Sequence, residues 1–110
     1  MKDEIKELAQ IVQRLNEEAD RATEDIREFQ CELNHAKVSF HASVVHEGCA
    51  LVWTREGGHG WYVWSTKEGK PLLSASRETR IRSVEVLPAL LEAILKEAHR
   101  ELRASGLEAS

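Results

Sequence analysis

The sequence predicts an α+β fold: a long N-terminal coiled-coil helix, a three- to four-stranded antiparallel β-meander and a long C-terminal helix. Three observations support this prediction. Apolar residues follow a heptad over positions 5–33, the apolar period changes to two between about 36 and 76, and a helical stripe returns over 81–102. Five of the six glycines lie between positions 48 and 69, so the helix-breaking residues are concentrated in the predicted sheet.

The first helix is predicted by apolar residues at alternating spacings of three and four, with no Gly or Pro among residues 1–34. A seam of this kind, unbroken over four heptads, is typical of a coiled coil. We therefore expect it to form an oligomer interface. The seam residues are Ile5, Leu8, Val12, Leu15, Ala19, Ala22, Ile26 and Phe29, continuing to Leu33. The Ala19 and Ala22 layer either lets two backbones approach closely or faces a bulky side chain from elsewhere.

The flanking positions leave the orientation of the partner open. A parallel homodimer would pair Glu4 with Ala9 and Ile11 with Asn16, and neither is an ion pair. Residues 3–34 would span about 48 Å as a helix, which exceeds the roughly 30 Å diameter expected for the rest of the chain. The sequence thus favours a homo-oligomer, most simply a two-fold dimer. An intramolecular antiparallel pairing with the C-terminal helix is the competing explanation.

Alternating apolar residues predict the strands of the sheet. Residues 38–44 alternate in this way, and residues 49–54 and 61–65 form two further candidate strands around Gly57 and Gly58. If these glycines form a two-residue turn, Trp53 lies opposite Tyr62. Leu51, Trp53, Tyr62 and Trp64 then share one face, with Val52, Thr54, Trp61 and Val63 on the other. Both faces are apolar, so one needs a cover beyond the helices. Residues 70–74 form a possible edge strand, blunted by Pro71.

The last helix is predicted to begin at Ser74 or Ser76, either of which can cap it. Its apolar stripe runs from Ile81 to Leu102. Pro88 either kinks this helix or restarts it as a first-turn residue. We expect residues 1–34 to act as a dimerisation helix, and residues 36–106 to form a small meander with the C-terminal helix, packed as one domain with it.

Length and charge bound the class of protein. The chain has 110 residues, with 15 Lys and Arg against 19 Asp and Glu, for a formal charge of −4. Residues 1–34 carry five basic and ten acidic groups, a net −5, which leaves +1 for the rest. No apolar run approaches the roughly 18 residues of a membrane span, and the N-terminus lacks the apolar core of a signal peptide, so we expect neither. Two cysteines make no disulfide framework. These features favour a cytoplasmic location.

Cysteines and histidines are concentrated in the middle of the chain, where a two-Cys, two-His zinc set can be drawn. These residues are Cys31, His35, His41, His46, Cys49 and His59, and the set would combine Cys31 and His35 with His46 and Cys49. Their spacing matches no common zinc finger or ribbon, and nothing marks either thiol as an activated nucleophile. We therefore expect no metal, no cofactor, no catalytic residues and no enzymatic activity.

Aromatic and basic residues meet in the region 61–82. Trp, Tyr and Arg are enriched at interface hot spots, so this region is a candidate surface for a protein partner. The predicted partner-binding residues are Trp53, Trp61, Tyr62, Trp64, Lys67, Lys70, Arg77, Arg80 and Arg82. The sequence thus predicts a non-enzymatic interaction or adaptor module that self-associates through its first helix. The alternative is a nucleic-acid-associated regulatory protein in which the same cations hold phosphates and the aromatics stack on bases.

Overall fold

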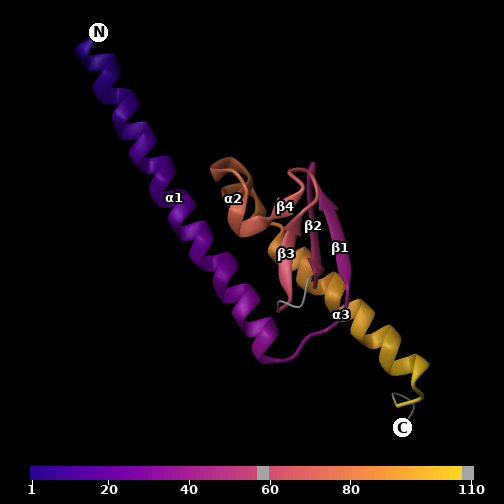
Figure 1. The fold of residues 1–110 in the computed structure, drawn as a ribbon. Helices are drawn as coiled ribbons and strands as arrows, with labels where there is room; N and C mark the ends of the chain where they lie inside the picture. Colours follow the sequence, from indigo (N-terminus) through magenta and orange to yellow (C-terminus); the bar gives the residue numbers. More distant parts are fainter. Residues whose placement is uncertain (57–59, 108–110) are drawn as a thin grey trace.

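Figure 1 shows a computed structural model of the chain, which describes residues 1–56 and 60–107. The predicted α+β fold is confirmed, with a long N-terminal helix, a four-stranded antiparallel sheet and a C-terminal helix. The elements are α1 Lys2–His35, β1 Ala42–His46, β2 Cys49–Thr54, β3 Tyr62–Ser65, β4 Lys70–Pro71, η1 Leu72–Ser74, α2 Arg77–Ser83 and α3 Leu87–Ala104. None of the described helices is long and apolar enough to cross a lipid bilayer.

Helix α1 ends in a Schellman motif. Lys37 adopts a left-handed conformation with φ of 58°, and its N–H donates to the carbonyl of Asn34 over 3.0 Å. The N–H of Val38 donates to the carbonyl of Leu33 over 2.9 Å. These two bonds satisfy carbonyls that a helix end otherwise leaves free. The chain then turns back and enters the sheet through Val38, which packs against the core.

The four strands form a meander in the order β1-β2-β3-β4, with every pair antiparallel. Glu47 and Gly48 join β1 to β2, and both have positive φ, as a tight two-residue hairpin turn requires. Strand β4 has only two residues. The edge strand predicted over residues 70–74 is therefore shorter than expected, because the chain enters the 3-10 turn η1 directly after Pro71 and buries Leu72.

The side chains of α1 complete the hydrogen bonding of β3 where β4 is too short to reach. Gln30 Oε1 accepts from the N–H of Val63 over 2.9 Å. Asn34 accepts from the N–H of Trp61 over 3.1 Å and donates to its carbonyl over 2.7 Å. Backbone groups at a sheet edge need partners, and the last turns of α1 provide them here. These bonds fix the sheet against the C-terminal part of α1.

The predicted C-terminal helix is two helices. Ser76 caps α2, as predicted, by accepting from the N–H of Thr79 over 3.3 Å. Pro88 lies in the first turn of α3, so it restarts the helix rather than kinking it. The Glu68 carboxylate also receives the N–H and hydroxyl of Ser76, at 2.9 and 2.8 Å. Hydrogen bonds from Thr79 and Ser76 lower the pKa of Glu68 to about 2.

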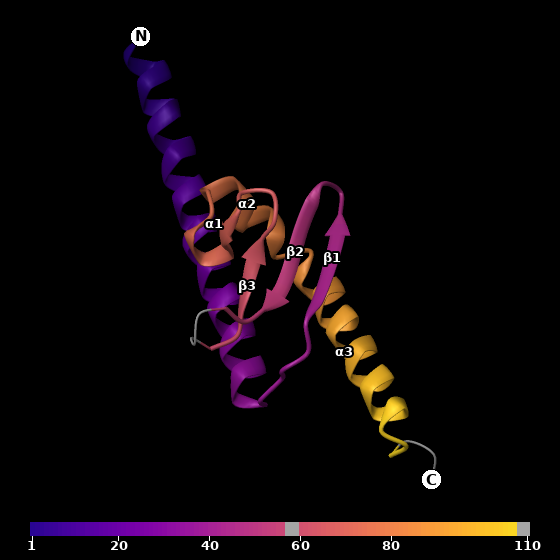
Figure 2. The ribbon, with the colours of Figure 1, turned by 45° about the vertical axis from the view of Figure 1, so that its right-hand side comes forward.

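The core lies between one face of the sheet and the helices α1 and α3. Leu51, Trp53 and Val63 point into it from the sheet, where they meet Ile26 of α1 and Leu90 of α3. All five side chains are fully buried. Figure 2 shows α1 along the β3 side of the sheet and α3 crossing below β1 and β2.

The molecule is elongated because two helices extend beyond this core. Its principal extents are 69 × 28 × 22 Å, and its radius of gyration is 17.4 Å. A compact chain of this length would have a radius of gyration of roughly 13 Å. Figures 1 and 2 show the N-terminal part of α1 projecting at one end and the C-terminal part of α3 projecting at the other. The two helices do not form the intramolecular antiparallel hairpin that the sequence left open.

Candidate functional site

The heptad seam of α1 is used in two different ways along its length. In the half nearer the C-terminal end of α1, which we call the lower half, Ala19, Ala22 and Ile26 are exposed by only 3, 4 and 0%. Phe29 is half-buried, and its ring meets Trp53 edge-on with centroids 6.2 Å apart. These four predicted interface residues therefore pack within their own chain.

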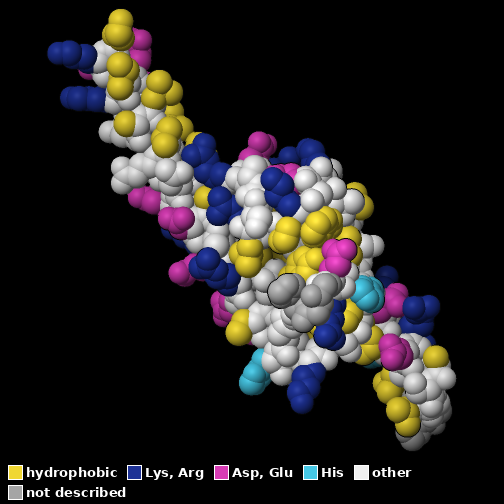
Figure 3. Space-filling view, viewed as in Figure 1, with side chains coloured by type: hydrophobic (Ala, Val, Ile, Leu, Met, Phe, Trp, Pro, Cys, Tyr) yellow, Lys and Arg dark blue, Asp and Glu magenta, His cyan; other side chains and the backbone are white. Residues whose placement is uncertain are grey.

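The upper half of the seam is largely exposed in the part of the chain that the structure describes. Ile5, Leu8, Val12 and Leu15 are exposed by 58, 59, 45 and 37%, and Ile11 beside them by 49%. Figure 3 shows apolar side chains following one another along the projecting part of α1. The exposed surface is a continuous stripe, which is unusual on a soluble monomer. We call residues 5, 8, 11, 12 and 15 the upper seam.

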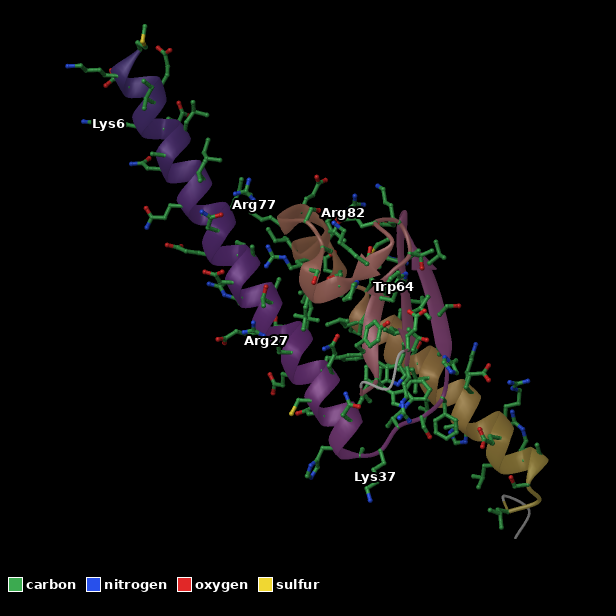
Figure 4. The ribbon with its side chains drawn as sticks, in the orientation of Figure 1. Lys6, Arg27, Lys37, Trp64, Arg77 and Arg82 are labelled. Atoms are coloured by element: carbon green, nitrogen blue, oxygen red, sulfur yellow. The ribbon has the colours of Figure 1, made fainter. Side chains whose placement is uncertain are left out.

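Helix α2 lies beside α1 from Asn16 toward the C-terminal end of α1. Arg77 Nη1 donates to Asn16 Oδ1 over 2.9 Å, and Arg80 Nη1 donates to Thr23 Oγ1 over 2.6 Å. Figure 4 shows Arg77 between the two helices. Asn16 and Thr23 each follow a seam residue, so these bonds hold α2 against the seam.

The alanine layer of the seam is what admits α2. Ala22 lines a groove together with Ile81 of α2 and with Val84, the residue that follows this helix. Of the two possibilities that the sequence left open for this layer, the structure has the second, a bulky side chain from elsewhere in the same chain. On its other side Ile81 lines a second groove with Leu15 and Arg77, so the upper seam runs directly into the α1–α2 junction.

The pairing of β2 with β3 differs by one residue from the expected register. Trp53 lies opposite Val63, and Val52 lies opposite Trp64. The expected pairing of Trp53 with Tyr62 is therefore wrong. The last pair joins Thr54 to Tyr62, so the connection spans residues 55–61 instead of two glycines. The expected Gly57–Gly58 turn itself lies outside the described residues.

This shift of one residue exchanges the faces of every residue in β3, because side chains alternate along a strand. Val63 and Ser65 are buried with Leu51 and Trp53, at 0–1% exposure. Trp61 lies on this inner side, with its ring stacked on Trp53 at a centroid distance of 6.1 Å. Two of the predicted partner-binding residues, Trp53 and Trp61, thus belong to the core or pack against it.

The outer face of the sheet carries the other two predicted aromatics. Tyr62 and Trp64 are half-buried, with ring centroids 6.2 Å apart, and Trp64 is labelled in Figure 4. Val52 pairs with Trp64 on this face, and Val45 at its edge is 74% exposed. Burial and the neighbouring Glu56 raise the pKa of Tyr62, whose hydroxyl donates to that carboxylate over 3.3 Å. We call Val45, Val52, Tyr62 and Trp64 the outer sheet face.

The predicted cations do not gather into one cluster. Arg80 is half-buried and also donates to the carbonyl of Ala75 over 3.1 Å, so its guanidinium holds α2 in place. Arg82 donates to the carbonyl of Glu47 over 2.9 Å, across to the β1–β2 turn. Lys67 and Lys70 lie exposed at the turn between β3 and β4. Arg77, Arg80 and Arg82 thus all make hydrogen bonds within the chain.

The cysteines and histidines lie apart or pack within the chain where the structure describes them. Among residues 1–56 and 60–107, no group of three or more possible ligands could hold a metal ion. His59 lies outside those residues. The ring of His41 packs on Trp61 with centroids 4.6 Å apart, and its Nδ1 meets Thr54 Oγ1 at 3.2 Å. Burial raises the pKa of the Cys49 thiol, against the opposing charges of Arg82 and Lys67.

Sequence reasoning missed a further exposed stripe on α3. Leu91, Leu95 and Leu102 are exposed by 46, 55 and 38%, beside the buried stripe of Leu90 and Ile94. The signal was present, because the apolar stripe of this helix was too wide for a single contact face. The roles of Gln30 and Asn34 in bonding β3 were also missed, and nothing in their residue type could have revealed these roles.

No protein-family model matches the chain, and neither a curated protein nor a solved structure is significantly similar to it.

Proposed function

We propose that the protein is a non-enzymatic interaction module that self-associates through the upper seam of α1 and binds a protein partner through its outer sheet face. One observation carries the first part. Four consecutive seam positions, Ile5 to Leu15, present large aliphatic side chains to solvent at 37–59% exposure. A heptad seam of this kind is stabilised when a second helix covers it.

The physical argument for a partner helix concerns the stability of α1 itself. Isolated helices shorter than about 12–15 residues are marginal in water because nucleating a helix is costly, so helices in proteins gain most of their stability from packing of the apolar face. Within residues 1–56 and 60–107, the seam above Asn16 is exposed, with Leu15 at its end lining a groove with Ile81 of α2, while the part below it packs on α2 and the core. A second copy of the chain supplies the missing packing surface.

The first experiment compares two substitutions that add the same charge within one turn of α1. Leu8→Asp places a carboxylate in the seam, and Gln10→Asp places one on the opposite, polar side. In light scattering at tens of micromolar we expect the unmodified chain and Gln10→Asp at twice the 12.5 kDa chain mass, and Leu8→Asp at 12.5 kDa. An unmodified chain that stays at 12.5 kDa contradicts the proposal, and so does a Leu8→Asp variant that stays dimeric.

The second part of the proposal concerns the outer sheet face. Antiparallel sheets commonly face water on one side, but that side is then polar. Here Val52 lies opposite Trp64, whose ring is paired with that of Tyr62, and Val45 adds an exposed apolar side chain on β1. Aromatic side chains dominate the energetics of protein interfaces. A protein ligand with a complementary apolar surface would cover this face.

Trp64→Ser tests the outer face, with Val45→Ser as a milder companion at its edge. Val45→Ser should leave the thermal unfolding midpoint nearly unchanged because Val45 is 74% exposed, and Trp64→Ser should lower it without preventing folding because Trp64 is half-buried outside the core. Proteins that the unmodified chain captures and Trp64→Ser does not are then purified and titrated against both. Equal affinity of the two variants for every such protein would contradict this part of the proposal.

Nucleic-acid binding has less support as a function of the same region. The stacking mode requires exposed aromatics close to free cations. Trp53 and Trp61 pack in or against the core, and Arg80 bonds to Thr23 and Ala75. A mobility shift at low salt that weakens steeply as salt is added would revive this alternative.

A further inference from the structure

We infer that the upper seams of two copies pair antiparallel, around a two-fold axis near Gln10, so that the two sheets lie at opposite ends of the dimer. This inference rests on the proposed self-association and names its geometry. The sequence alone left parallel, antiparallel and intramolecular pairing open. The position of α2 distinguishes among them.

A parallel pair is obstructed because α2 occupies the seam below Leu15. The bond between Arg77 and Asn16 fixes where α2 begins to cover α1. In a parallel dimer the two helices would run on side by side past this point, and both copies of α2 would require the same space between them. In an antiparallel dimer only the first turn of each copy, residues 1–4, lies level with the start of the other copy's α2, so the two copies of α2 remain far apart.

The antiparallel register follows from the spacing of the exposed residues. With Gln10 at the centre, Ile5 lies level with Leu15 of the second copy, and Leu8 lies level with its Val12. Every exposed seam residue then faces another exposed seam residue. Moving the register by one heptad would set the seam of one copy against Ala22 of the other, which α2 already covers.

Two apolar residues that do not occupy the alternating three- and four-residue spacing of the seam also fit this arrangement. Ile11 and Ala9 flank the seam on opposite sides, and Ile11 is 49% exposed. In the antiparallel pair each lies next to the axis, so Ile11 meets Ile11 and Ala9 meets Ala9 of the second copy. In the parallel pair Ile11 would face Asn16 instead. Antiparallel pairing therefore buries the apolar residues that widen the stripe.

The surface available is large enough for a specific dimer. From their exposed fractions, the five upper-seam side chains present roughly 500 Å² of apolar surface per copy, at the upper end for a patch on a soluble monomer. Covering this patch on both copies removes roughly 1,000 Å², the lower bound expected for a biological interface. The α1–α2 junction groove lined by Leu15 and Ile81 adds contact for the first turn of the second copy.

Engineered cysteines determine the orientation directly. In a Cys31→Ser, Cys49→Ala background, Ile5→Cys and Leu15→Cys are prepared separately and mixed, then oxidised mildly and run on a non-reducing gel. Antiparallel pairing predicts a disulfide dimer in the mixture and little in either variant alone, since a disulfide needs Cα atoms within about 7 Å. Ala9→Cys, which leaves all the upper-seam side chains in place, should cross-link with itself.

The outcomes separate this inference from the proposed function. Efficient self-cross-linking of Ile5→Cys indicates parallel pairing, which overturns the inference and leaves self-association intact. If the unmodified chain has double mass but neither the mixture nor Ala9→Cys cross-links, the antiparallel seam is wrong and self-association uses another surface. An unmodified chain at 12.5 kDa removes both.

Discussion

The two halves of α1 carry the same heptad repeat of apolar residues, but they differ in what covers these residues. Above Asn16 the seam consists of large aliphatic side chains that are 37–59% exposed, whereas Ala19, Ala22 and Ile26 below it are nearly or fully buried. The spacing of apolar residues is the same in both halves. Side-chain size marks the change, because two alanines make room for α2 of the same chain. In α1 the alanine layer thus marks the point in the heptad repeat at which packing against the same chain begins.

The largest difference between the halves should appear when one large side chain is truncated. Ile26→Ala removes a fully buried side chain, and changes of this kind destabilise proteins by about 2–5 kcal/mol. Leu8→Ala in the upper seam, measured at a concentration low enough to keep the chain monomeric, should cost less than about 1 kcal/mol. Urea unfolding of both variants tests this, and equal losses would contradict the division of the seam.

A second comparison adds volume instead of removing it. Ala22→Leu inserts three carbons beneath α2, where overpacking typically costs about 1–3 kcal/mol. Ala9→Leu makes the same change beside the exposed upper seam, where the larger side chain has room. We expect Ala22→Leu to lower the thermal midpoint, and Ala9→Leu to leave the monomer's midpoint unchanged while strengthening self-association. The reverse order would show that α2 does not close the seam at Ala22.

The division of the seam could not be predicted from its period. A heptad repeat shows which side of a helix is apolar. It does not show whether the element that packs on this side belongs to the same chain or to another. The fold class was accessible from residue type and spacing, which also narrowed the cap to Ser74 or Ser76, of which the structure uses Ser76. The break between α2 and α3 was left as one of two possibilities, because Pro88 is compatible with both a kink and a new helix.

The assignment of the β3 residues to the two faces of the sheet was wrong for a different physical reason. Register in a hairpin depends on the length of the turn, and a change of one residue exchanges both faces. Because both sides of β2 and β3 are apolar, the alternation of residues could not reveal the error. Trp61 and Val63 therefore lie on the inner side with Trp53, and Tyr62 and Trp64 lie on the outer face.

The third prediction concerns the carboxylate that holds α2 over the lower seam. The pKa of Glu68 is lowered from 4.5 to about 2, so its ionised form favours the folded state. This contribution is complete above about pH 4.5 and is lost as the pH falls toward 2. Glu68→Gln should therefore lower stability at pH 7 and flatten its dependence on pH between about 4.5 and 2. Denaturant unfolding at several pH values tests this, and parallel profiles for the two proteins would contradict it.

The smallest expected effect comes from a charge beside the upper seam. In the antiparallel dimer Glu4 lies near Glu18 of the second copy, whose carboxylate already receives Arg21 of its own chain over 3.2 Å. Glu4→Lys replaces a like-charge pair with an attractive one, which on an exposed surface is worth less than about 1 kcal/mol. We expect the dimer dissociation constant to fall severalfold at low salt, and this gain to disappear as salt is added. Glu7→Lys, which makes the same charge change on the polar side of α1, is the control. In a parallel dimer Glu4 would face Ala9, so equal constants for the two variants in sedimentation equilibrium would argue against antiparallel pairing.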